Sequence, residues 1–252
     1  MEWRERDGVR WLEAELPGAR AAFSTRVGGV SSAPFDTLNL GILTDDDRDA
    51  VLENRRRLAA ALGLAAESVL IGRQVHETEV AGHDGPQRPS PFADPQDDLI
   101  EVDGHFTAEP GLAPLVFVAD CLPVALSGPG GVAMLHCGWR GMAAGIVARG
   151  AEAVGAEAAA IGPGIGPCCY EVGPEVLDAF GGLGDGIAAG RMLDLGEVAR
   201  RLLDAAGVGR VEASGHCTSC APDLFFSHRR DAGRTGRQGG LVWIREGARW
   251  PA

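Results

Sequence analysis

The stretches Leu-Val-Phe-Val-Ala-Asp-Cys at residues 115–121 and Val-Ala-Met-Leu-His at residues 132–136 decide the fold. Each is a short apolar run that ends on a side chain able to bind a metal. A third run, residues 69–75, leads in the same way into His76. Short apolar runs are typical of buried strands, and enzymes built from sheets and helices present reactive groups where a strand gives way to a loop. The three runs therefore predict a protein of mixed strands and helices with its chemistry at strand ends.

His76, Cys121 and His136 together offer two imidazoles and one thiolate. This donor set suits a zinc ion that keeps one coordination position open, and an open position is typical of catalysis rather than structural support. The three residues are far apart in the sequence, so only folding can unite them. The alternative is that Cys121 is a small buried hydrophobic residue and that each histidine is only hydrogen-bonded.

The composition excludes several classes of protein. The chain has 252 residues and a formal net charge of −12. That charge argues against a general nucleic-acid binder, which needs a basic face, but it leaves room for a local basic pocket for phosphate. No stretch approaches the roughly 20 apolar residues of a transmembrane helix, and the charged N-terminus precedes no apolar signal core. We therefore expect a cytoplasmic protein with no membrane partner, and the sparse cysteines predict reduced thiols.

Periodicity and turn signals outline the order of elements. The clearest helix is expected at 48–62, with acidic residues before it and Gly63 as its stop. Further helices are expected at 142–154, 174–180 and 196–207, strands at 9–12, 21–26 and 240–244, and a surface loop at 82–98. Mixed elements with short connections predict one α/β or α+β domain over residues 1–252, whose strand order the pattern does not reveal.

Several polar residues lie beside the three runs. Arg140, in Cys-Gly-Trp-Arg-Gly, can hold a phosphate or carboxylate, or it can form a salt bridge beside a packed tryptophan. Asp120 can orient a metal ligand, carry a proton, or serve only as a turn or capping carboxylate. The Gly/Pro-rich loop 162–172 lacks the ending of a P-loop and fits the wall of an active site. Residues 225–231 place a histidine and two arginines after an aromatic stretch, where they can bind an anion.

Four other cysteines have no assigned role. Cys217 and Cys220 have zinc-type spacing and could join Cys168 and Cys169 in a four-sulfur structural site. No second Cys-x-x-Cys supports that site, so the sequence favours buried or incidental thiols.

Taken in order, these segments resemble the YfiH/YlmD-like family, also described as laccase-domain multicopper polyphenol oxidoreductases or peptidoglycan editing factors. The motifs that carry the resemblance span about residues 23–237, nearly the whole chain. They lie at 23–31, 38–40, 53–55, 74–76, 119–124, 136–141, 161–172 and 226–230. The chain departs from the family pattern at Glu77, where glycine is usual, and at Cys137, where alanine is usual; Cys220 is outside the pattern.

The resemblance implies a layered α/β fold, with central mixed sheets flanked by helices, similar to cytotoxic necrotizing factor-type hydrolases. It implies a zinc site at His76, Cys121 and His136, with Cys121 essential for catalysis. It also implies phosphorolysis of adenosine, inosine and methylthioadenosine, with adenosine deamination. The partners would be a purine nucleoside and phosphate, and we expect a monomer. Asp120 or Glu171 would carry the proton, and the residues expected to contact substrate or phosphate are Asn39, Arg55, Arg140, His228 and Arg229.

Other functions remain open from the sequence. A trinuclear copper oxidase needs many histidines in His-x-His pairs, whereas this chain has 6 histidines and no such pair. One Cu²⁺ could still replace zinc at the three ligands and give weak oxidase activity. A metal-free cysteine hydrolase would use Cys121 as nucleophile and His136 as base, for example on an amide of a cell-wall precursor. The third alternative function is that of a non-catalytic sensor of a metal or a nucleotide.

Overall fold

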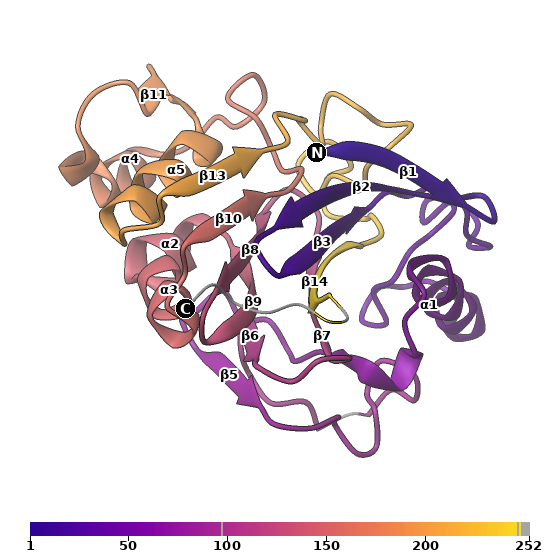
Figure 1. Ribbon diagram of the computed structural model, residues 1–252. Coiled ribbons are helices and arrows are strands. Elements are labelled where there is room, and N and C mark those ends of the chain that lie inside the picture. The colour runs from indigo at the N-terminus through magenta and orange to yellow at the C-terminus, as the bar shows by residue number, and fades with distance from the viewer. Residues whose placement is uncertain (97, 246, 248–252) are drawn as a thin grey trace.

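The computed structural model describes residues 1–96, 98–245 and 247. Two six-stranded mixed sheets lie face to face at its centre (Figure 1). In spatial order, the first sheet consists of β1 (Glu2–Arg6), β2 (Val9–Leu16), β3 (Ala19–Ser24), β14 (Gln238–Ile244), β7 (Ala113–Val118) and β4 (Val69–Leu70). The second consists of β13 (Arg210–Ala213), β10 (Ala158–Ile161), β8 (Leu122–Gly128), β9 (Gly131–Cys137), β6 (Gly104–Thr107) and β5 (Val80–His83). A small ribbon pairs β11 (Ala188–Ala189) with β12 (Met192–Leu193).

Helices cover the outer faces of both sheets (Figure 1). Helix α1 (Arg48–Leu62) packs on the first sheet. The outer face of the second sheet carries α2 (Trp139–Ala144), α3 (Ile146–Val154), α4 (Pro174–Ala179) and α5 (Leu195–Ala205). Two short 3₁₀ turns, η1 (Ala66–Ser68) and η2 (Gly181–Leu183), complete the elements. The expected layered α/β fold is therefore confirmed, and no helix in the described part of the chain is long and apolar enough to cross a membrane.

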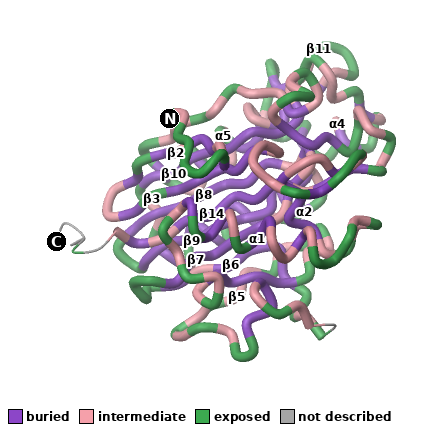
Figure 2. The backbone as a smooth tube through the Cα atoms, turned by 90° about the vertical axis from the view of Figure 1, so that its right-hand side faces the viewer, coloured by how far each residue is buried: buried purple, intermediate pink, exposed green. Residues whose placement is uncertain are grey.

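Side-chain alternation along the central strands explains the layers. In β9, Val132 and Met134 point into the core between the sheets, whereas Ala133 and Leu135 point toward the helices. Successive side chains of a strand face opposite sides, so a strand covered on both sides reads as a continuous apolar run. Figure 2 shows the central strands as a buried layer beneath more exposed loops.

The expected helix at 48–62 is confirmed with the same bounds as α1. The Asp47 carboxylate accepts the amide of Ala50 at 2.8 Å, which satisfies a donor left unpaired at the helix start. Gly63 takes the left-handed conformation, with φ 73°, that ends many helices. The expected helix at 142–154 is wrong in one respect, because Gly145, with φ 102°, separates α2 from α3.

The expectation that all three ligands lie at strand ends needs correction. His76 lies in a loop, because β4 stops at Leu70. Directly after β4, the side-chain amide of Gln87 exchanges two hydrogen bonds with the backbone of Ile71, as the backbone of a neighbouring strand would. His136 lies inside β9, one residue before its end. Cys121 lies in the short turn after β7, directly before β8, where the chain passes from the first sheet to the second.

Candidate active site

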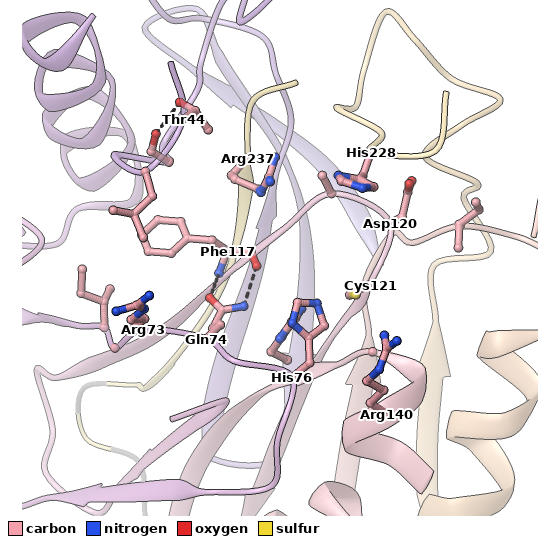
Figure 3. A pocket seen from close by; sticks show the side chains of 18 of the residues that line it. Thr44, Arg73, Gln74, His76, Phe117, Asp120, Cys121, Arg140, His228 and Arg237 are labelled. Atoms are coloured by element: carbon pink, nitrogen blue, oxygen red, sulfur yellow. Dashed lines mark hydrogen bonds between the residues drawn. The ribbon is translucent and has the colours of Figure 1, made fainter. Parts of the chain in front are cut away.

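A cavity of about 550 Å³ opens where the chain crosses between the sheets (Figure 3). Its volume falls within the range of about 300–1,000 Å³ that is typical of small-molecule sites. The three predicted ligands line it together with aromatic and cationic side chains. The cationic residues of the lining are Arg55, Arg73, Arg140, Arg229 and Arg237.

His76, Cys121 and His136 come together at one side of this cavity. One ligand atom from each lies within 4.8 Å of the others. The two imidazole rings are 4.8 Å apart between centroids and nearly perpendicular, at 71°. His136 is buried, Cys121 is half-buried and His76 is exposed, so the group extends from the protein interior to the exposed side of the cavity. The folded chain thus brings together the residues that the sequence proposed as metal ligands.

Asp103 supports this group from behind, and the sequence reasoning did not single it out. Its carboxylate accepts the Nδ1–H of His136 at 2.7 Å. It also accepts the backbone amides of Val75, His76 and Glu77, at 2.8–3.0 Å. These hydrogen bonds from the backbone amides hold His76 at φ 65°, a conformation that costs a non-glycine residue about 1–3 kcal/mol. One buried carboxylate therefore fixes both histidine-bearing segments.

Charges within the group stabilise a thiolate. Burial raises the pKa of Cys121, but the charge of His136 and hydrogen bonds from both imidazoles outweigh it and lower that pKa to about 6. Burial likewise opposes charge on His136, but Cys121 and Asp103 outweigh it and raise the His136 pKa to about 9. Because Asp103 accepts the hydrogen bond from Nδ1, Nε2 is the nitrogen of His136 that could coordinate a metal ion. Two imidazoles, a thiolate and a carboxylate behind one histidine fit a zinc site with an open position.

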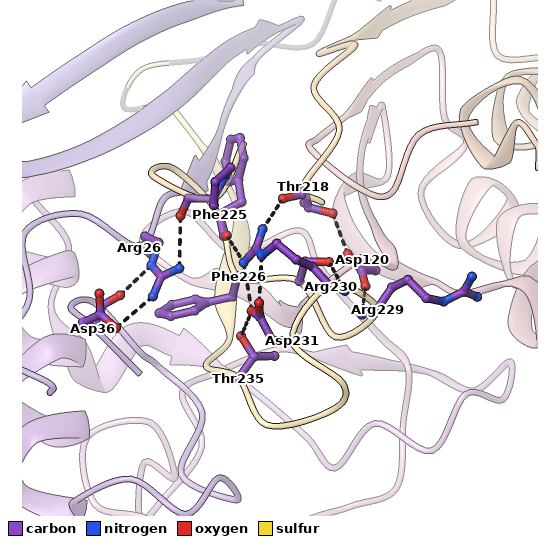
Figure 4. Close-up of polar contacts among 12 residues, drawn as sticks. Arg26, Asp36, Asp120, Thr218, Phe225, Phe226, Arg229, Arg230, Asp231 and Thr235 are labelled. Atoms are coloured by element: carbon purple, nitrogen blue, oxygen red, sulfur yellow. Dashed lines mark hydrogen bonds and ion pairs between the residues drawn. The ribbon is translucent and has the colours of Figure 1, made fainter. Parts of the chain in front are cut away.

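Asp120 lies at the cavity but its carboxylate already has partners (Figure 4). Oδ1 accepts the Thr218 hydroxyl at 2.6 Å, and Oδ2 accepts the Arg229 backbone amide at 2.7 Å. Asp120 also has φ 92°. These contacts match the turn-carboxylate interpretation, in which Asp120 holds the loop that carries Arg229. Proton transfer by Asp120 stays a prediction.

Arg55 is a buried cation at the cavity. Only 1 % of the residue is exposed, and its guanidinium lies over the rings of Phe92 and Phe117 at 5.1 and 5.2 Å. Among the described residues, its acceptors are the backbone carbonyls of Leu40, Pro91 and Phe92, none of which carries a charge. Burial lowers its pKa to about 10, so it remains charged at neutral pH. A buried charge without a carboxylate partner favours an anion in the cavity.

Further cations surround the opening. Arg140 is exposed and stacks on Trp139 at 4.5 Å. Arg229 lies 5.3 Å from the ring of Tyr170 and donates to the Glu171 carbonyl at 2.9 Å. His228 also lines the cavity.

Arg237 is a lining residue that the sequence reasoning missed. Its guanidinium donates to the carbonyls of Thr235 and Gly236, and burial lowers its pKa. Gln74 is another supporting residue: its amide exchanges hydrogen bonds of 2.7 and 2.8 Å with the backbone of Phe117 (Figure 3). Gln74 belongs to the motif at residues 74–76, but no sequence signal pointed to Arg237.

Asn39, expected to contact the substrate, and Glu171, expected to carry a proton, do not line the cavity. Asn39 is fully buried, and its side-chain amide is used within the protein by Gly41, Thr44, Asp46 and Arg237. Asn39 therefore shapes the loop beside the cavity rather than its surface. The Glu171 carboxylate is more than half exposed and lies 3.2 Å from Arg191.

Comparisons with known proteins relate this chain to one family. The family model described as multi-copper polyphenol oxidoreductase laccase matches residues 20–245. A curated protein of Pseudomonas aeruginosa named purine nucleoside phosphorylase is 39% identical over 260 residues, covering 94% of this chain and 99% of that protein. The purine nucleoside phosphorylase YlmD of Geobacillus stearothermophilus is 37% identical, covering 94% and 95%.

Solved structures show the same fold. The crystal structure of the Bacillus licheniformis hypothetical protein YfiH superposes with a TM-score of 0.86 at 33% identity, covering 96% of this chain and 99% of that one. The crystal structure of YlmD from Geobacillus stearothermophilus gives a TM-score of 0.84 at 36% identity, covering 96% and 98%.

Proposed function

This chain belongs to the YfiH/YlmD family of laccase-domain proteins, and from that premise we propose that it is a zinc-dependent purine nucleoside phosphorylase. Its substrates would be phosphate and adenosine, inosine or methylthioadenosine, and it would also deaminate adenosine. The proposal extends to this chain the activity in the names of its curated relatives. We likewise propose that it acts as one domain and as a monomer.

The observation that carries the proposal is a cationic cavity in an acidic protein. The chain has a net charge of −12, yet five arginines line the cavity beside the His76, Cys121 and His136 group. A buried guanidinium such as Arg55 strongly favours a multiply charged anion over a neutral ligand. Phosphate supplies that charge, and the aromatic rings of Phe117, Trp139 and Tyr170 offer flat apolar surface for a purine.

The chain's own residues would divide the work of phosphorolysis. The glycosidic bond of the nucleoside breaks, a phosphate oxygen bonds to the sugar carbon, and the base leaves with a proton. Arg55 and Arg229 would hold the phosphate, with Arg140 at the opening as a further contact, which places a nucleophile beside the sugar. Of the two predicted proton carriers, only Asp120 lines the cavity. Bound by His76, Cys121 and His136, zinc would supply a Lewis acid in the cavity.

The residues of this chain support copper-dependent oxidation, which the family's description names, less well than zinc-dependent phosphorolysis. Its 6 histidines include no His-x-His pair, and the cavity brings together two imidazoles and one thiolate. Such a set could hold one copper ion, since copper outcompetes zinc at these ligands. We therefore interpret any polyphenol oxidation as a side activity of the copper-loaded protein.

A phosphate-dependent adenosine assay tests the main proposal. The purified protein should release adenine and ribose 1-phosphate from adenosine only when phosphate is present, as followed by chromatography. Cys121→Ala should abolish this activity and reduce bound zinc. Cys137→Ala is the matched control, because Cys137 is fully buried and does not line the cavity. Absence of base release from all three nucleosides by zinc-loaded protein would reject the proposal.

One observation favours a cysteine hydrolase as the second candidate. Cys121 accepts a hydrogen bond from His136, and His136 donates to Asp103. A nucleophile, a base and a carboxylate that orients the base form the usual arrangement of a cysteine hydrolase. Amide hydrolysis by metal-free protein, with no turnover of nucleosides, would favour this candidate.

A further inference from the structure

Four cysteines outside the cavity form a second cluster of metal-type ligands. Cys168 and Cys169 come from the Gly/Pro-rich loop, and Cys217 and Cys220 come from the loop after β13. Their four Sγ atoms all lie within 4.8 Å of one another. We propose that these four cysteines bind a structural zinc ion. This proposal does not depend on the proposed function, because none of the four lines the cavity.

The sulfur geometry is close to that of a four-thiolate zinc site. A tetrahedron with zinc–sulfur distances of about 2.3 Å has sulfur–sulfur edges of about 3.8 Å. In this protein the Sγ of Cys220 lies 3.4 Å from the Sγ of both Cys168 and Cys169. Small rotations of the cysteine side chains would place all four Sγ atoms at bonding distance from one zinc ion. Zinc prefers this soft donor set, and four sulfur ligands leave no position open for catalysis.

Backbone amides around the cluster are arranged to support thiolates. The amide of Gly166 donates to the Sγ of Cys217 at 3.2 Å, and the amide of Cys220 donates to the same sulfur. Amide donors to sulfur are the kind of outer contact that orients metal ligands. Gly166 also leaves room beside the cluster, because a Cβ there would make a tight contact of 3.1 Å with the Cβ of Cys217.

The sequence favoured buried or incidental thiols, and the exposure of these side chains contradicts the first of those two alternatives. Cys168 and Cys220 are exposed, and Cys169 and Cys217 are half-buried. Four thiols gathered at a surface are accessible to metal ions from solvent. The sequence offered these four cysteines as a possible four-sulfur site but favoured buried or incidental thiols. The fold brings the adjacent pair and the Cys-x-x-Cys pair together.

The ion would hold together two loops that shape the cavity. The loops already meet through the bridge between Gly164 and Cys217 and through the bond from the Thr218 amide to the Gly164 carbonyl, 2.9 Å long. One loop continues into Tyr170 of the cavity wall. The other carries Thr218, whose hydroxyl donates to Asp120 (Figure 4). Zinc would therefore stabilise the cavity wall without contacting substrate.

Alkylation of the wild-type protein tests the site directly. Zinc-saturated, reduced protein is treated with iodoacetamide with and without a strong chelator, and labelled peptides are quantified by mass spectrometry. We expect the four cysteines to be protected together and to label together once zinc is removed, because a bound thiolate is a poor nucleophile. Immediate labelling of Cys168 and Cys220 in zinc-saturated protein would overturn the proposal, as would a disulfide between them in the purified protein.

Metal analysis in a variant background separates the two sites. Cys121→Ala removes one cavity ligand, so about one zinc ion per chain should remain at the four-cysteine cluster. Adding Cys217→Ser and Cys220→Ser should remove that ion, whereas adding Cys137→Ala should not. If the triple variant does not fold, the Cys121→Ala protein alone decides: folded protein without zinc after incubation with the metal overturns the proposal.

Discussion

The Nδ1 of His136 donates to the Oδ1 of Asp103 at 2.7 Å, and both side chains are buried. The same carboxylate accepts three consecutive backbone amides, beginning at Val75. Asp103 therefore links a histidine within a strand to a histidine within a loop. This one carboxylate orients the imidazole of His136 directly and fixes the backbone that carries His76.

Asp103→Asn should weaken metal binding at the cavity. Loss of a carboxylate that orients a metal-bound histidine typically lowers metal affinity by about 10- to 100-fold. Zinc affinity can be measured by competition with a chromogenic chelator. Glu79→Gln is the control, because the Glu79 side chain forms an exposed ion pair with Arg149. Equal zinc affinity in Asp103→Asn and wild type would contradict the role assigned to Asp103.

Cys121 should resist alkylation while zinc is bound. A zinc-bound thiolate reacts slowly, whereas a free thiolate beside His136 reacts at once. Iodoacetamide labelling of Cys121, followed by peptide mass spectrometry, should therefore rise sharply when a chelator is added. Rapid labelling of Cys121 in zinc-saturated protein would instead support the cysteine hydrolase.

Gly138→Ala should disturb the cavity group without changing a ligand. A Cβ at Gly138 would lie 3.0 Å from the Sγ of Cys121 and 3.3 Å from the Cδ2 of His76. Overpacking of this kind costs about 1–3 kcal/mol, which corresponds to roughly 5- to 150-fold in zinc affinity. Gly85→Ala is the matched control, because a Cβ there meets nothing within 4 Å. A similar zinc affinity in both variants would show that the group has room to adjust.

Arg140→Ala should raise the KM for phosphate in the nucleoside assay. Arg140 is exposed at the cavity, so its removal should leave the fold intact. A hydrogen bond to a charged group contributes about 1.5–3 kcal/mol, which predicts a rise of roughly 10- to 150-fold. The control is Arg149→Ala, whose side chain pairs with Glu79 and does not line the cavity. An unchanged KM would remove Arg140 from the phosphate site.

His105 should make the protein less stable in mild acid. Burial and the neighbouring His83 lower the pKa of His105 to about 3, although Asp103 opposes the shift. In the unfolded chain His105 has an ordinary histidine pKa of 6.5. Between pH 6.5 and about 3, His105 therefore binds a proton in the unfolded chain but not in the folded one. Stability from this residue is therefore present above pH 6.5 and is lost progressively as the pH falls toward about 3.

Urea unfolding at several pH values measures this effect. One proton taken up on unfolding changes the free energy of unfolding by up to about 1.4 kcal/mol per pH unit. Between pH 6.5 and 5, the carboxylates titrate little and the slope reports mainly histidines. His105→Gln should reduce the slope by up to that amount, whatever its effect at neutral pH. An identical slope in both proteins would show that His105 is protonated in the folded state.

Several features of this protein follow from local sequence. Helix α1 matches its prediction because its apolar spacing, the Asp47 cap and Gly63 all act within a few residues of each other. The ligands His76, Cys121 and His136 could be proposed because each follows or ends an apolar run. Arg140 beside Trp139 belongs to the same kind of local signal.

The tertiary structure decided what depends on distant pairing. Asp103 meets His136, and the adjacent cysteines at 168 and 169 meet Cys220, only because strands from different parts of the chain form two sheets. Arg237 reached the cavity and the Glu171 carboxylate did not, although only Glu171 lay in a recognised motif. The physical reason is that caps and periodicity act over neighbouring residues, whereas strand order and loop contacts depend on which surfaces are buried together.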